Sequence, residues 1–259
     1  MMKKFLFLLC GLFLSLGAFS QAKFEKRELA FGPDQTLPYQ ILYPSNMEKG
    51  KKYPVILFLH GAGERGSDNE KQLTHGSKLF LDPSNQSKYP AIVIFPQCPA
   101  NSYWSTVKID RNTKPTTFVF EYPKEPNWPL AAAVSIVKSL VKEKVADKKR
   151  LYIMGLSMGG MGTFEAISRN PKMFAAAAPI CGGADLHFVK KYAKKLPLWI
   201  FHGDADAVVP VRHSREAVAA LKEAGANPTY TEYPGVNHNS WDNAFKEPEL
   251  FSWMFSHKK

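Results

Sequence analysis

The sequence shows neither the residue spacing of a metal site nor the pattern of a nucleic-acid-binding surface. Only 3 cysteines occur in 259 residues, and none is paired with another cysteine or with a histidine at ligand spacing. The formal net charge is +11, but no basic stripe with interleaved aromatic residues carries it. We therefore expect no metal ion, no cofactor and no nucleic-acid partner.

The excess positive charge is spread over short pieces of the chain, such as Lys142–Lys149 and Lys190–Lys195. Pieces of this kind are typical of solvated helix faces. A positive excess can also favour an acidic polysaccharide or an anionic surface as a partner, so the charge alone does not identify one.

No apolar stretch is long enough to cross a membrane. The most apolar one, Phe5–Leu16, follows two lysines and precedes the small-residue pattern Ala18-Phe19-Ser20, which is the arrangement of a secretory signal peptide. We therefore expect residues 1–20 to be a signal peptide and Gln21 to begin the mature protein. The protein is then secreted or periplasmic, with no stable membrane insertion after cleavage. An uncleaved membrane anchor is the alternative.

Internal repeats and linkers are also absent, which argues against several domains. A chain of 259 residues suits one large α/β domain, and we expect residues 21–259 to form it. Strands are predicted near residues 23–30, 37–43, 55–59, 91–95, 151–155, 175–180, 197–202 and 228–233, and helices near 72–80, 129–144, 159–169, 185–194, 211–224 and 242–256. This alternation predicts an α/β fold with a mostly parallel central sheet of about eight strands and helices on both faces. We interpret the irregular residues 100–128 as an insertion near a binding site.

The stretch Leu151–Ala166, LYIMGLSMGGMGTFEA, contains the pattern G-x-S-x-G between a buried strand and a helix. Glycines flank Ser157 because a strand that turns into a helix within three residues crowds its own backbone, and a Cβ there would clash. The strained turn presents the serine hydroxyl to a substrate. The pattern predicts that Ser157 is a nucleophile; a glycine-rich helix start that only packs closely is the alternative.

A serine hydroxyl needs a histidine to take its proton and a carboxylate to orient that histidine. In parallel sheets such sites form beyond the carboxyl ends of the strands. Asp206 follows the strand predicted near 197–202, and His238 follows the one near 228–233. The order Ser157, Asp206, His238 is that of an α/β-hydrolase triad, with Asp204 as the alternative acid.

The chain resembles an α/β-hydrolase of the secreted esterase and "predicted peptidase" kind, and it is similar to carboxylesterases and to feruloyl and acetylxylan esterases. The resemblance spans roughly residues 35–256 and rests on LPYQILYP, VILFLHGAGERG, FPQCP with a later Trp, RLYIMGLSMGGMGTF, PICGG, IFHGDADAVVP and NHNSW. It implies that Asp206, the second aspartate of the HGDAD turn, is the catalytic acid. Asp204 is then expected to hold the turn through backbone amides. His60 and His202, which begin His-Gly turns, are expected to bond backbone groups.

An oxyanion formed during acyl transfer needs two backbone N–H donors. The first is expected from Met158, directly after the serine. The second is expected from the turn after residues 55–59, where two glycines let the backbone approach the substrate. The resemblance assigns this donor to Ala62, with Gly63 as the rival.

Four further residues are candidate substrate contacts. Glu64 follows the oxyanion turn, with an internal salt bridge as the alternative role. Gln97 and Trp104 follow the strand predicted near 91–95, and Trp104 is either a pocket wall or a core residue. Trp241 lies close to His238 in the sequence, where plain packing is the alternative.

Cys98 and Cys181 are expected to be free, buried thiols. The resemblance implies that they follow strands separated by two others, which places them roughly 14 Å apart. A disulfide requires Cα atoms within about 7 Å, so we expect no bridge between them.

The first hypothesis for function is a secreted serine esterase that cleaves carboxylic esters through an acyl-enzyme. The resemblance favours short-acyl, acetyl or feruloyl esters, either small molecules or esters linked to plant polysaccharide. A serine peptidase of related fold is the alternative. A non-catalytic polysaccharide-binding protein is the hypothesis from a different class.

Overall fold

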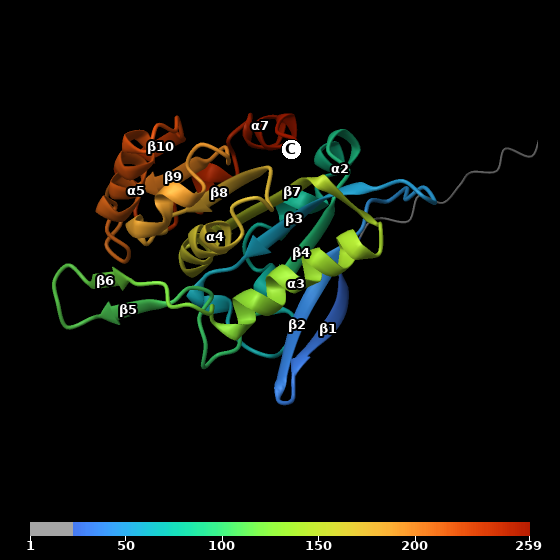
Figure 1. Ribbon diagram of the computed structural model, residues 1–259, viewed down its shortest axis with the longest axis horizontal. Helices are drawn as coiled ribbons and strands as arrows, with labels where there is room; N and C mark the ends of the chain where they lie inside the picture. The colour runs from blue at the N-terminus through green and yellow to red at the C-terminus, as the bar shows by residue number, and fades with distance from the viewer. Residues whose placement is uncertain (1–22) are drawn as a thin grey trace, which may run out of the picture.

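A central eight-stranded sheet, in the order β1-β2-β4-β3-β7-β8-β9-β10, organises the computed structural model, which describes residues 23–259 (Figure 1). The signal peptide expected at residues 1–20 lies outside the described residues. β1 pairs with β2 and β2 with β4 in antiparallel fashion, and the remaining neighbours are parallel. The predicted sheet is thereby confirmed. Its strands are β1 (Glu25–Gly32), β2 (Gln35–Leu42), β3 (Tyr53–Leu59), β4 (Ile92–Pro96), β7 (Ala146–Leu156), β8 (Ala176–Ile180), β9 (Trp199–Gly203) and β10 (Thr229–Tyr233).

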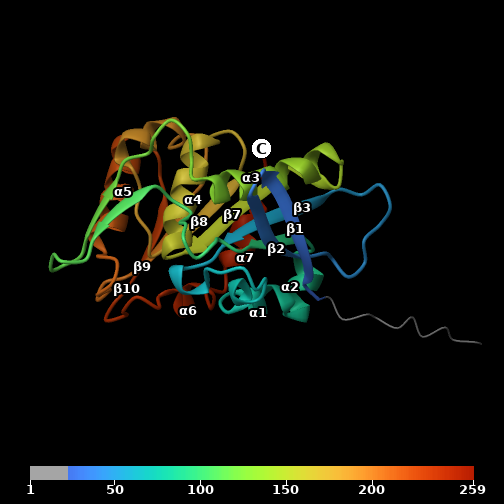
Figure 2. The same ribbon diagram turned by 90° about the horizontal axis from the view of Figure 1, so that it is seen from below.

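Helices cover both faces of this sheet (Figure 2). One face carries α3 (Trp128–Lys142), α4 (Met158–Arg169) and α5 (Arg212–Glu223); the other carries α1 (Ser77–Leu81), α2 (Pro83–Lys88), α6 (Trp241–Ala244) and α7 (Leu250–Ser256). Successive side chains of a strand point to opposite faces, so Leu57 packs in the core under α3 and α4, and Phe58 packs in the core under α1 and α7. Strands β3, β4, β8 and β9 are buried along their whole length, which explains their unbroken apolar runs. Short 3₁₀ helices occur at η1 (Ala62–Glu64), η2 (Lys71–Leu73) and η3 (Leu186–Lys191).

Two expected helices are divided in the structure, the one expected near 185–194 is the 3₁₀ helix η3, and one helix was not expected. The last helix, expected over residues 242–256, is divided into α6 and α7 by a segment that contains Pro248, because proline lacks the N–H that an internal turn needs. The helix expected at 72–80 is divided at Gly76, whose φ of +82° is left-handed. Helix α2 was not expected; its first turn is capped by Asp82, whose Oδ1 accepts a hydrogen bond from Asn85 N at 3.0 Å.

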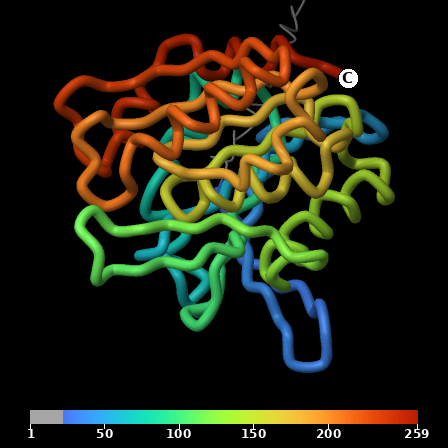
Figure 3. The backbone as a smooth tube through the Cα atoms, turned by 60° about the vertical axis from the view of Figure 1, so that its left-hand side comes forward, coloured from blue at the N-terminus to red at the C-terminus, as the bar shows by residue number. Residues whose placement is uncertain are grey.

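Residues 100–128 are more regular than the sequence indicated. They contain an antiparallel hairpin formed by β5 (Val107–Asp110) and β6 (Thr117–Phe120). The hairpin pairs with no strand of the main sheet and projects beyond it (Figure 1). Phe118 anchors it in a small core with Met161 of α4 and Val209. In Figure 3 the green hairpin accordingly runs beside the yellow and orange part of the chain.

The two cysteines of the described chain are free and buried, as expected. Cys98 follows β4 and Cys181 follows β8, and β3 and β7 lie between these strands. The strand order thus keeps the thiols apart. Within residues 23–259, no helix has both the length and the apolar character required to span a bilayer.

Candidate active site

Ser157 is the single residue between β7 and α4. Its φ of +54° and ψ of −117° lie outside the ordinary regions for a residue with a Cβ. A Cβ added at Gly159 would overlap the carbonyl oxygen of Leu59, and one added at Gly155 would meet the Gly159 carbonyl. The glycines therefore allow the start of α4 to lie directly against the end of β3, and the turn presents Ser157 at that edge.

His238 joins the two other side chains of the expected triad. Its Nε2 lies 2.9 Å from Ser157 Oγ, and its Nδ1 lies 2.7 Å from Asp206 Oδ2. A carboxylate only accepts hydrogen bonds, so Nδ1 carries the proton and Nε2 accepts the hydrogen of the serine hydroxyl. These residues follow β7, β9 and β10, so the three sequence-predicted side chains meet at the carboxyl edge of the sheet.

Asp206 is held as an anion by several donors. Burial acts to raise the pKa of this carboxyl, but hydrogen bonds from His202, His238 and the backbone N–H of Val209 hold its pKa well below the usual range. Its Oδ1 accepts from Val208 N at 2.8 Å and from Val209 N at 2.9 Å. Asp206 is therefore ionised across the neutral and mildly acidic range.

Asp204 has a different role from Asp206. Its Oδ1 accepts a hydrogen bond from Gly235 N at 2.6 Å, and so ties the turn after β9 to the turn after β10. This is the turn-holding role that the sequence indicated. In the structure His238 bonds Asp206 and not Asp204.

His202 does more than the expected bonding to backbone. Its ring is fully buried at the end of β9, and Nε2 lies 2.9 Å from Val209 O and 3.2 Å from Asp206 Oδ2. The carbonyl only accepts, so Nε2 is protonated and also faces the carboxylate. Ser214 Oγ lies 2.7 Å from Nδ1 and completes the support. The i, i+4 spacing of histidine and aspartate in HGDAD was the signal for this contact.

We predict that His202→Ala lowers kcat by about tenfold to a hundredfold, the size expected when a hydrogen bond to a charged group is lost. The reason is that Asp206 would lose one of its donors and His238 would be held less firmly. His202→Gln, which keeps an N–H in reach of the same carboxylate, serves as the control and should recover most of the loss. Steady-state kinetics with p-nitrophenyl acetate, together with melting temperatures, would measure the effect. Equal kcat for the alanine variant and the wild type would contradict a positioning role.

Met158 and Ala62, the expected oxyanion donors, both lie beside Ser157. Met158 is the first residue of α4, so its backbone N–H has no partner within the helix. Ala62 begins η1 directly after the β3 turn, and it lines the same pocket as Ser157. The helix start and the turn therefore border the serine from two sides.

A pocket of about 320 Å³ opens at Ser157 and His238. Sequence reasoning anticipated Ala62, Glu64 and Trp241 among its walls. The ring of Trp241 stands edge-on to His238, with centroids 5.4 Å apart. Glu64 lines the pocket, as a substrate contact would. Its Oε1 also lies 3.7 Å from His75 Nε2, which is the geometry of the internal salt bridge given as the alternative. The sequence did not single out the further lining residues His75, Tyr103, Arg111, Phe118 and Val208. Three of them belong to residues 100–128, which it placed near a binding site as a whole.

Gln97 and Trp104 do not line this pocket, which corrects the expected substrate contact. Both side chains have no exposed surface. Gln97 accepts a hydrogen bond from Asn69 N at 2.7 Å and donates to the Glu64 carbonyl at 3.2 Å. Trp104 Nε1 donates to the His60 carbonyl at 3.1 Å. They brace the loops behind the site, and His60 is bonded to backbone as expected.

One group of possible metal ligands occurs in the described part of the chain: Cys181, Asp206 and His238. Two of its members are already bonded to each other. Burial, and then the nearby Asp206 carboxylate, raise the pKa of the Cys181 thiol far above its usual value. His238 Nε2 is also bonded to Ser157 Oγ, so these side chains are already arranged for proton transfer.

Three features define an α/β-hydrolase: the strand order, the strand–turn–helix at Ser157, and the contacts of His238 with Ser157 and Asp206. The chain belongs to the Phospholipase/Carboxylesterase family, whose profile matches residues 46–251. It is accordingly a hydrolase of the carboxylesterase family.

Individual relatives agree with this assignment. The chain is 28% identical to Carboxylesterase SOBER1 of Arabidopsis thaliana over 212 residues, which cover 77% of this chain and 88% of the relative. It is 27% identical to a bifunctional acetylxylan esterase/xylanase of Neocallimastix patriciarum over 184 residues, which cover 71% of this chain and 23% of that protein. The solved structure of a thermostable esterase is similar with a TM-score of 0.81 and 38% identity, over 91% of this chain and 63% of that one. The last two relatives are thus matched over only part of their length.

Proposed function

We propose that the protein hydrolyses carboxylic esters with Ser157 as the nucleophile, His238 as the base and Asp206 as the residue that orients the base. The observation that carries this proposal is the continuous pair of contacts from Ser157 Oγ through the imidazole to Asp206, at 2.9 and 2.7 Å. His238 removes the hydroxyl proton as Oγ attacks the ester carbonyl, and it returns that proton to the leaving alcohol. The acyl group then rests on Ser157 until water, activated by the same imidazole, releases it.

The negative charge that develops on the carbonyl oxygen is stabilised by hydrogen-bond donors that are already in place. We assign this role to the backbone N–H groups of Met158 and Ala62, which border Ser157 from α4 and from the β3 turn. Loss of one such donor typically costs about 10²–10³ in turnover. The positive charge that forms on His238 is balanced by the buried, ionised Asp206.

The substrates that suit this site best are short-acyl, acetyl or feruloyl esters of plant polysaccharide. The pocket at Ser157 is small, and Tyr103, Phe118 and Trp241 give it aromatic walls. The β5–β6 hairpin forms one side of it, since Phe118 belongs to β6. The similarity to an acetylxylan esterase/xylanase supports the same class of ester. We also propose that residues 1–20 direct export, so that the single domain of residues 21–259 acts outside the cytoplasm.

A substrate comparison tests this function. We expect measurable release of acyl groups from p-nitrophenyl acetate and from methyl ferulate or acetylated xylan, and no comparable cleavage of an aminoacyl anilide. Faster cleavage of the anilide would favour the peptidase alternative. Failure of a fluorophosphonate probe to label Ser157 would favour the non-catalytic, polysaccharide-binding alternative.

A further inference from the structure

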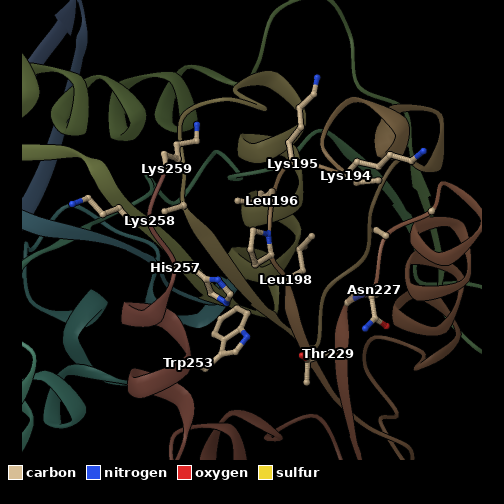
Figure 4. A pocket seen from close by; sticks show the side chains of 16 residues that line it. Lys194, Lys195, Leu196, Leu198, Asn227, Thr229, Trp253, His257, Lys258 and Lys259 are labelled. Carbon is tan, nitrogen blue, oxygen red and sulfur yellow. The ribbon is translucent and has the colours of Figure 1, made fainter.

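A second, larger groove lies at the sheet edge opposite the triad (Figure 4). It is formed by residues 193–198, which lead into β9, by residues 225–229, which lead into β10, and by Trp253 of α7 and residues 257–259 after it. The triad residues follow β7, β9 and β10, so the groove and the triad lie at opposite ends of the same strands. The groove has a volume of about 750 Å³, compared with about 320 Å³ at Ser157.

The charged side chains that line this groove are all of one sign. Four lysines line it, namely Lys194, Lys195, Lys258 and Lys259, and no aspartate or glutamate does. All four are exposed, and none appears in an ion pair among residues 23–259. Burial, and then the nearby Lys172 ammonium, lower the pKa of Lys259. Lys258 lies near the Asp147 carboxyl and helps to lower its pKa. Asp147 is already paired with Arg150 at 2.8 Å, so it does not form an ion pair with Lys258.

The lysines stand on two sides of an apolar floor. In Figure 4 Lys258 and Lys259 lie on the left and Lys194 and Lys195 on the right, with Leu196 between the two pairs and Leu198, His257 and Trp253 below them. Trp253 is partly exposed, and its ring stands edge-on to His257 with centroids 5.1 Å apart. The groove therefore combines cationic rims with a recessed aromatic and aliphatic floor.

These features match one kind of occupant. A chain of uronate sugars carries carboxylates that lysine ammonium groups attract, and its C–H faces pack on apolar and aromatic side chains. A flat anionic membrane would reach the lysine rims but not the recessed floor. We propose that this groove binds an acidic polysaccharide and so retains the enzyme on its polymer at a place separate from the triad. The proposal does not depend on which acyl group the triad removes.

Affinity electrophoresis in gels that contain polygalacturonate tests the groove. The test variant is Lys195→Glu with Lys258→Glu, which reverses one charge on each side. The matched control is Lys49→Glu with Lys88→Glu, which changes the net charge equally at two exposed lysines that lie outside the groove. We expect the wild type to be retarded at low ionic strength and the test variant to bind roughly tenfold more weakly, since two attractive contacts become repulsive.

The control variant and Ser157→Ala should bind polygalacturonate like the wild type. Both double variants should cleave p-nitrophenyl acetate at the wild-type rate, which separates this site from the reaction. No retardation of the wild type, or equal loss in the test and control variants, would overturn the proposal. Stronger binding to phosphatidylglycerol vesicles than to polygalacturonate would overturn it in favour of a membrane surface.

Discussion

Ser157→Ala is expected to reduce esterase turnover to the residual of about 10³–10⁴ over the uncatalysed rate that remains when a triad is dismantled. The oxyanion donors and the pocket stay in place in this variant, but no oxygen is left to form the acyl-enzyme. The hydroxyl is bonded to His238 at 2.9 Å, so its removal leaves the imidazole without a proton to accept. Initial rates with p-nitrophenyl acetate, and the absence of a fluorophosphonate adduct, would measure the loss.

Ser168→Ala provides the control for this experiment. Ser168 lies on the same helix, and its hydroxyl donates to the Phe164 carbonyl at 2.8 Å, so the variant removes a buried serine without touching the reaction. It should keep wild-type turnover. Undiminished ester hydrolysis by Ser157→Ala would rule out Ser157 as the nucleophile, whatever the stability of the protein.

Asp206→Asn should lower kcat by about 10⁴, the loss seen when an amide replaces the carboxylate of a triad. An asparagine that donates to His238 Nδ1 would place the imidazole proton on Nε2, where it can no longer accept the proton of Ser157. Asp204→Asn keeps an oxygen that can accept from Gly235 N, and we expect it to lose less than about tenfold. Kinetics of the two variants, measured side by side, would compare them. The opposite ranking would transfer the role of the acid to Asp204.

The low pKa of Asp206 determines the pH range in which protonation of this carboxylate affects the protein. The pKa of Asp206 is depressed in the folded protein, so its ion contributes stability above the ordinary aspartate pKa and loses that contribution only as the pH falls through the folded value. Protonation of Asp206 is therefore not the cause of activity loss in the mildly acidic range.

The sequence predicted the elements whose physical cause is local. The G-x-S-x-G turn was predictable because each glycine prevents a clash with the nearby backbone, at Leu59 O in the case of Gly159. The parallel sheet was predictable because strands buried on both faces, such as β3, show unbroken apolar runs. The rule that sites form at the carboxyl ends of such strands placed the acid after β9 and the base after β10. The choice of Asp206 over Asp204 came from the resemblance to α/β-hydrolases.

The sequence did not predict which way a loop side chain points after its strand ends. Gln97 and Trp104 come after β4, as a substrate contact would, yet both point into the protein and bond backbone groups. Arg111 enters the pocket because a hairpin carries it there. The sequence did not indicate the lysine-lined groove either, because Lys195 and Lys258 are far apart in the sequence and each alone resembles an ordinary solvated residue.

The β5–β6 hairpin contributes Phe118 to the pocket wall without belonging to the main sheet. Its two strands pair with each other and with no strand of the main sheet, and Phe118 fixes the hairpin to Met161 and Val209. Residues 111–116 at its tip can therefore be exchanged or lengthened without disturbing the ladder of the main sheet. A scaffold of this kind can diversify the esters it accepts, in nature or by loop grafting, while the chemistry beneath stays fixed.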